Sequence, residues 1–109
     1  MSERIVKLNK LIKEHLGEIF QRELSLKSGV FLTIAKVDIS SDIRYARVSL
    51  SVFPFSDSNY AIKTIEKEIY TIQGALNKKL KMRPLPRLQF ILDSTEEEAD
   101  KIEKILISL

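Results

Sequence analysis

Residues 74–93 read GALNKKLKMRPLPRLQFILD and join the end of a helical pattern to a strand pattern. Pro84 and Pro86 cannot continue a helix, and each favours extended geometry in the residue before it. The segment has one acidic residue, Asp93, and five basic residues: Lys78, Lys79, Lys81, Arg83 and Arg87. This composition predicts a rigid cationic corner that could contact phosphates. The alternative is that these lysines only keep the helix end soluble and interact favourably with the negative end of the helix dipole.

A long or broken amphipathic helix precedes this corner, from Tyr60 to Leu80. Its apolar stripe comprises Ile62, Ile65, Ile69, Ile72, Leu76 and Leu80. The opposite side is a cationic ridge with one aromatic residue and one glycine: Lys63, Lys67, Tyr70, Gly74, Lys78 and Lys81. Such a ridge suits a nucleic acid backbone, and it is also typical of a solvated helix face. Because an interior glycine costs about 1 kcal/mol relative to alanine, Gly74 predicts either a kink or the close approach of a partner's backbone.

The first half of the chain predicts a helix followed by a β-hairpin. The helix runs from about Glu3 to about Leu24, and its apolar stripe comprises Ile5, Leu8, Ile12, Leu16 and Ile19. Residues 30–40 and 44–53 are rich in β-branched residues and flank a short polar turn. In the second run, one face is apolar: Ala46, Val48, Leu50 and Val52. This face needs a cover, which the amphipathic helices can supply.

The remaining segments complete an α+β pattern. Residues 54–59 predict a loop with Asp57 or Ser58 as a helix N-cap, and residues 87–92 predict a third strand. Ser94 and Glu97 form a capping-box pattern that opens a last helix, whose apolar stripe comprises Ala99, Ile102, Ile105 and Leu106. We expect one domain, residues 1–109, with a three-stranded sheet packed by helices in the order α-β-β-α-α-β plus a C-terminal helix.

Composition excludes several kinds of site. The chain has 109 residues, a net charge of +3 and no cysteine, so thiolate chemistry is excluded. His15 is the only histidine, which argues against a metal site or a catalytic triad and favours a packing role at the helix border. Glycine-rich nucleotide loops are absent. We therefore expect no enzyme, no cofactor and no metal, and the lack of signal-peptide or membrane-span patterns favours the cytoplasm.

Charge is distributed unevenly along the sequence. Residues 94–109 have a net charge of −3, whereas the rest of the chain carries +6. An acidic tail beside a basic body suggests one face for a polyanion and another turned away from it.

Two sequence blocks resemble the ribosome-binding factor A family, bacterial assembly factors of the small ribosomal subunit. The first, residues 33–52, reads TIAKVDISSDIRYARVSLSV and matches the family at Val37, Ile39, Ser40, Asp42, Ala46 and Val48. The second, residues 80–93, matches at Lys81, Arg83, Pro86, Leu88, Phe90 and Asp93. Arg4 and Ile5 also fit, so the resemblance covers nearly the whole chain. The predicted element order is that of a type II KH domain.

This resemblance implies a non-catalytic RNA-binding protein, acting as a monomer. It would bind the small ribosomal subunit and its ribosomal RNA, assist late maturation, notably of the RNA 5′ end, and support growth in the cold. Combining the resemblance with the charge pattern, we expect RNA contacts from eight residues: Lys7, Lys10, Lys63, Lys67, Lys78, Lys81, Arg83 and Arg87. The alternatives are a protein-interaction domain that uses the outer sheet face around Tyr45 and Phe53, and a general single-stranded RNA-binding KH module.

The sequence departs from the family at the helix bend. Family members lack the usual KH G-x-x-G loop and bend the helix pair at an A-x-G kink, but Glu68, Ile69 and Tyr70 stand at that place here. Gly74 follows one turn later, and Gln73 stands where a basic residue is common. The position of the bend is therefore open from the sequence.

Overall fold

The computed structural model describes residues 3–81, 86–93 and 107–108. The elements in chain order are α1 (Glu3–Glu23), β1 (Phe31–Ile39), β2 (Tyr45–Phe53), the 3-10 turn η1 (Phe55–Asp57), α2 (Ser58–Lys67), α3 (Ile69–Leu80), β3 (Arg87–Leu92) and β4 (Ile107–Ser108). The predicted α+β order α-β-β-α-α-β is confirmed. The predicted capping box at Ser94 and Glu97, with most of the helix it opens, lies outside the described residues. The short β4 was not predicted.

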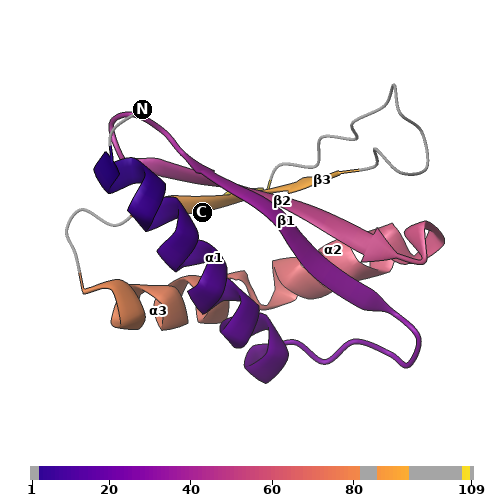
Figure 1. Cartoon of the computed structure of the whole chain (residues 1–109). Helices are drawn as coiled ribbons and strands as arrows, with labels where there is room; N and C mark the ends of the chain where they lie inside the picture. The colour runs from indigo at the N-terminus through magenta and orange to yellow at the C-terminus, as the bar shows by residue number, and fades with distance from the viewer. Residues whose placement is uncertain (1–2, 82–85, 94–106, 109) are drawn as a thin grey trace.

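The strands form one sheet in the order β1-β2-β3-β4. Antiparallel pairing joins β1 to β2 and β3 to β4, whereas β2 and β3 run parallel. A parallel pair needs a long crossover, which α2 and α3 provide between β2 and β3. Figure 1 shows that all three helices lie on the same side of the sheet. The three predicted strands are therefore present, and β4 extends the sheet beyond β3.

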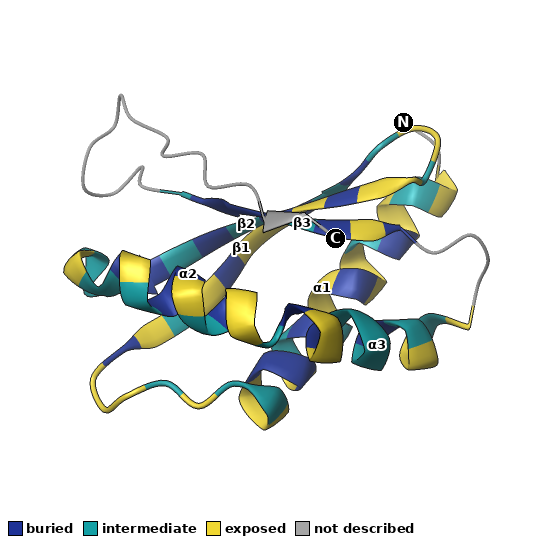
Figure 2. Ribbon diagram, turned by 180° about the vertical axis from the view of Figure 1, so that it is seen from behind, coloured by how far each residue is buried: buried dark blue, intermediate teal, exposed yellow. Residues whose placement is uncertain are grey.

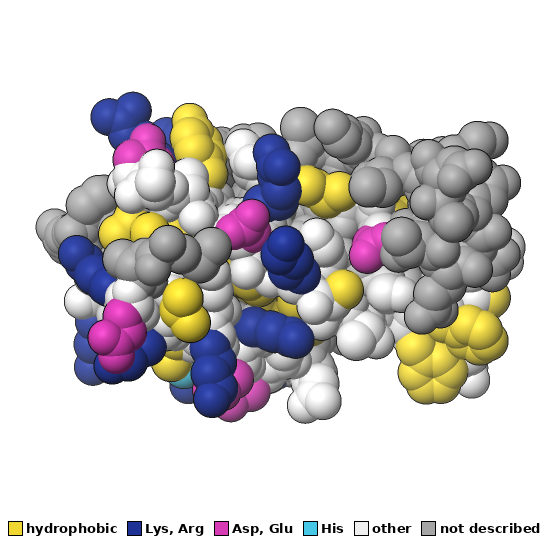
Figure 3. Space-filling model, turned by 45° about the horizontal axis from the view of Figure 1, so that its top comes forward, with side chains coloured by type: hydrophobic (Ala, Val, Ile, Leu, Met, Phe, Trp, Pro, Cys, Tyr) yellow, Lys and Arg dark blue, Asp and Glu magenta, His cyan; other side chains and the backbone are white. Residues whose placement is uncertain are grey.

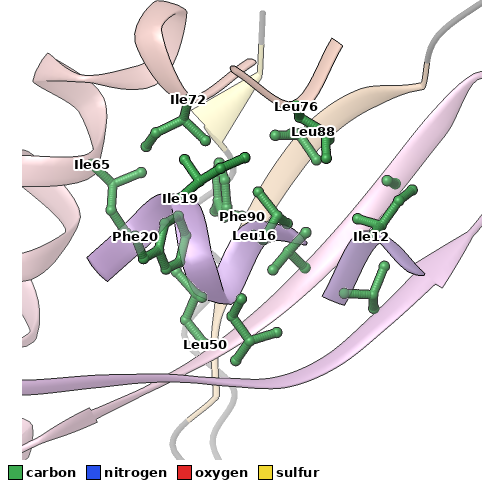
Figure 4. Packing of buried hydrophobic residues seen from close by; sticks show 14 of the residues in the cluster. Ile12, Leu16, Ile19, Phe20, Leu50, Ile65, Ile72, Leu76, Leu88 and Phe90 are labelled. Atoms are coloured by element: carbon green, nitrogen blue, oxygen red, sulfur yellow. The ribbon is translucent and has the colours of Figure 1, made fainter. Parts of the chain in front are cut away.

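The core lies between this helical layer and the sheet. From α1 it takes Leu8, Ile12, Leu16, Ile19 and Phe20. From β2 it takes the four alternating residues predicted from the sequence, Ala46, Val48, Leu50 and Val52, all of which are buried. The rings of Phe20 and Phe90 meet with their centroids 6.0 Å apart, which ties α1 to β3 at the centre of the cluster (Figure 4). Burial of these apolar side chains is the main force that holds α1 on the sheet.

The hairpin turn between β1 and β2 is held by the polar residues of the first family-like block. The Ser40 hydroxyl donates to Asp42 Oδ1 at 2.6 Å, and the Arg44 N–H donates to the same oxygen at 3.1 Å. These two hydrogen bonds lower the pKa of the exposed Asp42 carboxyl below its usual 3.8, because they favour the charged form. Ser40 and Asp42 therefore serve the turn, which places Ile43 at a φ of 60°.

The long helix is broken at Glu68, where the backbone leaves helical geometry with φ −105° and ψ 12°. The break divides the apolar stripe between α2 and α3, and both halves stay buried. Gly74 lies inside α3, so the idea that it kinks the helix is wrong. The bend falls at the place where the family-like pattern puts it, although Tyr70 replaces the family glycine.

The start of α2 differs in detail from the prediction. Asp57 occupies the N-cap position but makes no capping hydrogen bond with its side chain. Its carboxylate instead lies 3.0 Å from Lys27 Nζ. The Ser58 hydroxyl donates to the Phe55 carbonyl at 2.5 Å, within the turn. Part of the predicted loop is therefore a 3-10 turn, tied by the ion pair to the segment between α1 and β1.

Candidate nucleic-acid interface

The predicted RNA-binding residues belong to four elements. Lys7 and Lys10 lie on α1, Lys63 and Lys67 on α2, Lys78 on α3, and Arg87 at the start of β3. Lys81 ends α3 at the C-cap position. All seven are exposed, as a phosphate contact requires. The eighth, Arg83, lies outside the described residues.

A groove between α1 and α3 is lined by several cationic side chains and by Tyr70. Its lining from α1 is Arg22 and Glu23, and its lining from α3 is Tyr70, Thr71, Gly74, Ala75, Lys78 and Lys79. The groove has a volume of about 370 Å³. The helices α1 and α3 pack against each other, and they cross obliquely in Figures 1 and 2. The groove therefore joins residues that are far apart in the sequence.

Charges in this groove are only partly neutralised. Arg22 Nε lies 3.6 Å from Glu23 Oε1, a long and exposed ion pair. Such surface pairs contribute little and leave the cation available to a stronger anion. Within the ranges that the structure describes, Lys78 and Lys79 have no carboxylate within ion-pairing distance. With three cations and one carboxylate on its walls, the groove favours an anionic ligand.

Other predicted residues lie elsewhere on the surface. Lys7 Nζ is 3.3 Å from Glu3 Oε1. Lys10 lines a different groove along the exposed side of α1, together with Lys13, Glu14 and Glu18. These carboxylates dilute the positive charge there. Lys7 and Lys10 therefore do not line the groove between α1 and α3.

Arg87 faces the opposite side of the sheet from the helices. It pairs in register with Tyr45, whose neighbour Ala46 points into the core. Because successive side chains of a strand alternate between the two faces, Tyr45 and Arg87 share the outer face. Arg87, which was predicted to belong to the cationic corner, therefore lies on the face of the sheet opposite to the helices.

Gln73 connects α3 to the beginning of β3. Its Nε2 donates to the Pro86 carbonyl at 3.2 Å and to Asn77 Oδ1 at 3.0 Å, and its Oε1 accepts from the Leu88 N–H at 3.1 Å. A lysine could donate but could not accept the Leu88 N–H. This double role explains why glutamine fits this position, and it places α3 relative to the sheet.

The outer face of the sheet forms a second cationic surface. Lys36 and Arg47 are exposed there, and neither has an ion-pair partner among the described residues. Figure 3 brings the upper side of Figure 1 forward and shows Lys and Arg side chains with a few acidic ones between them. At the far end of the hairpin, Phe31 and Phe53 pair in register and are 63% and 68% exposed.

The eight predicted contact residues did not include Arg22 or Lys79, although Lys79 belongs to the predicted cationic corner. Arg22 follows the apolar stripe of α1 and has no local pattern that separates it from other surface cations. Only the packing of α1 against α3 brings it into the same groove as Lys78. The acidic and histidine side chains of the described residues form no cluster that could hold a metal ion. None of the helices described is both long and apolar enough to cross a bilayer.

Comparison with known proteins identifies the relatives of this chain. The family model described as Ribosome-binding factor A matches residues 4–106. A ribosome-binding factor A from Natranaerobius thermophilus is 32% identical over 92% of this chain and 77% of its own length. The crystal structure of ribosome-binding factor A from Thermus thermophilus is similar with a TM-score of 0.67 and 25% identity, over 81% of this chain and 93% of that one.

A further similar structure is a Thermus thermophilus ribosome-binding factor A homology model, fitted into the cryo-EM map of its complex with the 30S subunit. It has a TM-score of 0.64 and 27% identity, and the match covers 76% of this chain and 88% of that one.

Proposed function

Because the chain belongs to the ribosome-binding factor A family, we propose that it binds the small ribosomal subunit through ribosomal RNA. The observation that carries this proposal is the groove between α1 and α3, which is lined by Arg22, Lys78 and Lys79 together with an exposed tyrosine. Lysine and arginine contacts with phosphates supply most of the affinity for RNA and position a protein on it. The fitted complex of the Thermus relative with the 30S subunit supports the choice of partner.

The proposed contact surface is the α3 side of the molecule. It consists of the groove together with Lys81 at the end of α3, and Lys63 and Lys67 extend it along α2. From the sequence we add Arg83, which lies outside the described residues. Lys7, Lys10 and Arg87 contribute to contacts with other parts of the RNA. Specificity comes from the shape of the folded RNA, because phosphate contacts carry no sequence information.

In this proposal residues 1–109 act as one KH-like RNA-binding domain, without catalysis and without a cofactor. The protein assists late maturation of the small-subunit RNA, including its 5′ end, in the cytoplasm and notably during growth in the cold. It binds as a monomer. The exposed lysines of α3, available to phosphates, support a binding role.

Reversal of charge on α3 tests the proposed surface. The variant Lys78→Glu, Lys81→Glu, Arg83→Glu should lose association with small subunits, because three phosphate contacts become repulsive. Co-sedimentation with small subunits in a sucrose gradient measures the association. Far-ultraviolet circular dichroism should show an unchanged fold, since Lys78 and Lys81 are exposed.

The matched control reverses two cations on the outer sheet face and is compared with Lys78→Glu, Lys81→Glu, which changes the net charge by the same amount. The control variant Lys36→Glu, Arg47→Glu should keep most of its association. Equal loss in both double variants would show that overall charge, rather than the α3 side, decides binding.

The alternative of a protein-interaction surface is favoured by one observation, the exposed pair Phe31 and Phe53 on the outer face of the sheet. Exposed aromatic side chains are enriched where proteins meet. The variant Phe31→Ser, Phe53→Ser would then abolish association with small subunits while Lys78→Glu, Lys81→Glu retained it.

A further inference from the structure

We propose that the groove between α1 and α3 receives one unpaired nucleotide of the RNA, with its base on Tyr70 and its phosphate among Arg22, Lys78 and Lys79. This inference rests on the proposed function and deepens it, since it names the part of the RNA that this surface takes. It follows from three features of the groove: an unused aromatic ring, a glycine that the fold does not need, and uncompensated positive charge.

Tyr70 supplies the stacking surface. Its side chain is 80% exposed, more than any other large apolar residue in the described part of the chain. Its hydroxyl makes no hydrogen bond with described residues, so within that part of the chain the ring is not held by a polar contact. It stands in the first turn of α3, next to the buried Ile69. An aromatic ring beside cations is the usual platform on which an unpaired base stacks.

Gly74 provides an open floor one helical turn from Tyr70. A Cβ atom added at Gly74 would meet nothing within 4 Å, and the residue has no positive φ. The fold would therefore accept alanine, which is about 1 kcal/mol more favourable inside a helix. A glycine at this place instead lets a flat ligand lie close to the α3 backbone. Gly17 on α1 is equally open, but it lines other grooves and has no exposed aromatic residue beside it in them.

The cations occupy the positions that a phosphate needs. Lys78 follows Gly74 by one turn on the same side of α3, and Arg22 approaches from α1 on the facing wall. Arginine can also stack on a base through its planar guanidinium group. The volume of about 370 Å³ is in the range of sites for small ligands and admits one nucleotide. Base stacking and charge therefore act on the same ligand.

A pair of RNA hairpins tests this inference. One is fully paired, and the other carries a single bulged adenosine in the same stem. Fluorescence anisotropy with end-labelled hairpins should show that the protein binds the bulged hairpin about tenfold more tightly, which is the scale of one base–aromatic stack. Tyr70→Ala should remove this preference, whereas Tyr70→Phe should retain it because the ring is kept. Tyr45→Ala, which deletes an exposed tyrosine on the sheet, is the matched control and should also retain it.

A second pair of variants tests the floor of the groove. Gly74→Met fills the groove with a flexible side chain and should abolish the preference for the bulge. Gly17→Met makes the same change in α1 and should leave it intact. Both substitutions replace an interior helical glycine with a good helix former, so both proteins should fold.

Three outcomes would overturn the inference: equal affinity for the two hairpins, loss of the preference in Tyr45→Ala but not in Tyr70→Ala, or loss of the preference in Tyr70→Phe. Sedimentation with small subunits separates this failure from failure of the proposed function. Binding to subunits without a bulge preference overturns only the nucleotide site. A bulge preference without any binding to subunits overturns the proposed function and leaves the nucleotide site standing.

Discussion

Lys81 ends α3 in the left-handed conformation, with φ 49° and ψ 41°. Glycine is the usual residue at this position of a helix C-terminus, because a side chain with a Cβ atom pays about 1 kcal/mol for left-handed geometry. Gly74 shows the reverse arrangement, a glycine in regular helix where alanine would be more stable. At both positions the residue differs from the choice that stability alone would make, and both are candidate contacts with RNA.

Replacing Lys81 by glycine should separate the effect of this residue on stability from its effect on RNA binding. We expect Lys81→Gly to raise the free energy of unfolding by about 1 kcal/mol, because the backbone strain is relieved. The same variant should bind small subunits more weakly, since it loses one cation near the phosphates. Urea unfolding followed by circular dichroism measures the first effect, and sedimentation measures the second.

Lys79→Gly is the matched control for Lys81→Gly. It deletes the same side chain two residues earlier, in the last turn of α3, and should lower the free energy of unfolding by up to about 1 kcal/mol. A loss of stability in Lys81→Gly would mean that the lysine side chain itself holds the helix end.

At the scale of elements, two kinds of contact hold α3 in place, apolar packing and hydrogen bonds. Its buried face packs through Ile69, Ile72 and Leu76. Beside this apolar contact, the Gln73 side chain bonds the backbone of β3 at Pro86 and Leu88. Because the groove is built from α3 and α1, these contacts also set its shape.

Gln73→Ala should lower the free energy of unfolding by about 1–2 kcal/mol, because it leaves the Leu88 N–H and the Pro86 carbonyl without the partners that Gln73 supplies. Amide hydrogen exchange at Leu88 should become faster in this variant. Gln21→Ala is the control, since Gln21 is an exposed glutamine on α1 without a hydrogen bond to described residues. Equal stability of the two variants would contradict the role assigned to Gln73.

The break between α2 and α3 shows how far element boundaries follow from the sequence. The apolar stripe runs through Glu68 without interruption, so hydrophobic spacing predicts helix on both sides of it. The sequence left two positions open: residues 68–70, where the family's A-x-G kink would fall but the motif is absent, and Gly74. The structure agrees with the former, because the cost of an interior glycine does not by itself open a helix.

For the whole molecule, salt dependence distinguishes RNA binding from protein binding. Contact with about six phosphates should weaken association with small subunits roughly a thousandfold between about 50 and 200 mM salt, because released counterions drive the binding. Sedimentation across this range, with protein in excess, measures the change. A nearly constant affinity would favour the exposed pair Phe31 and Phe53 as the contact surface.

The sequence by itself determined the types and order of the three helices and the three longer strands, and the buried faces of the helices and of β2, because periodicity is a local property that records which side meets the core. It also determined the family, through the turn residues Ser40 and Asp42 and the segment around Pro86. The predicted RNA-binding residues that the structure describes are exposed cations. The sequence indicated only in part which of them lie together on the surface.

Tertiary structure alone decided which cations share a surface. Arg22 and Lys78 line the same groove because α1 packs against α3, and Arg87 lies on the other side of the sheet because β3 pairs in register with β2. These arrangements depend on contacts between residues that are distant in the chain, which no local pattern of hydrophobicity or charge records. The sequence pattern around an apolar residue indicates whether that residue is buried. Which exposed charges lie together depends instead on how the helices and strands pack.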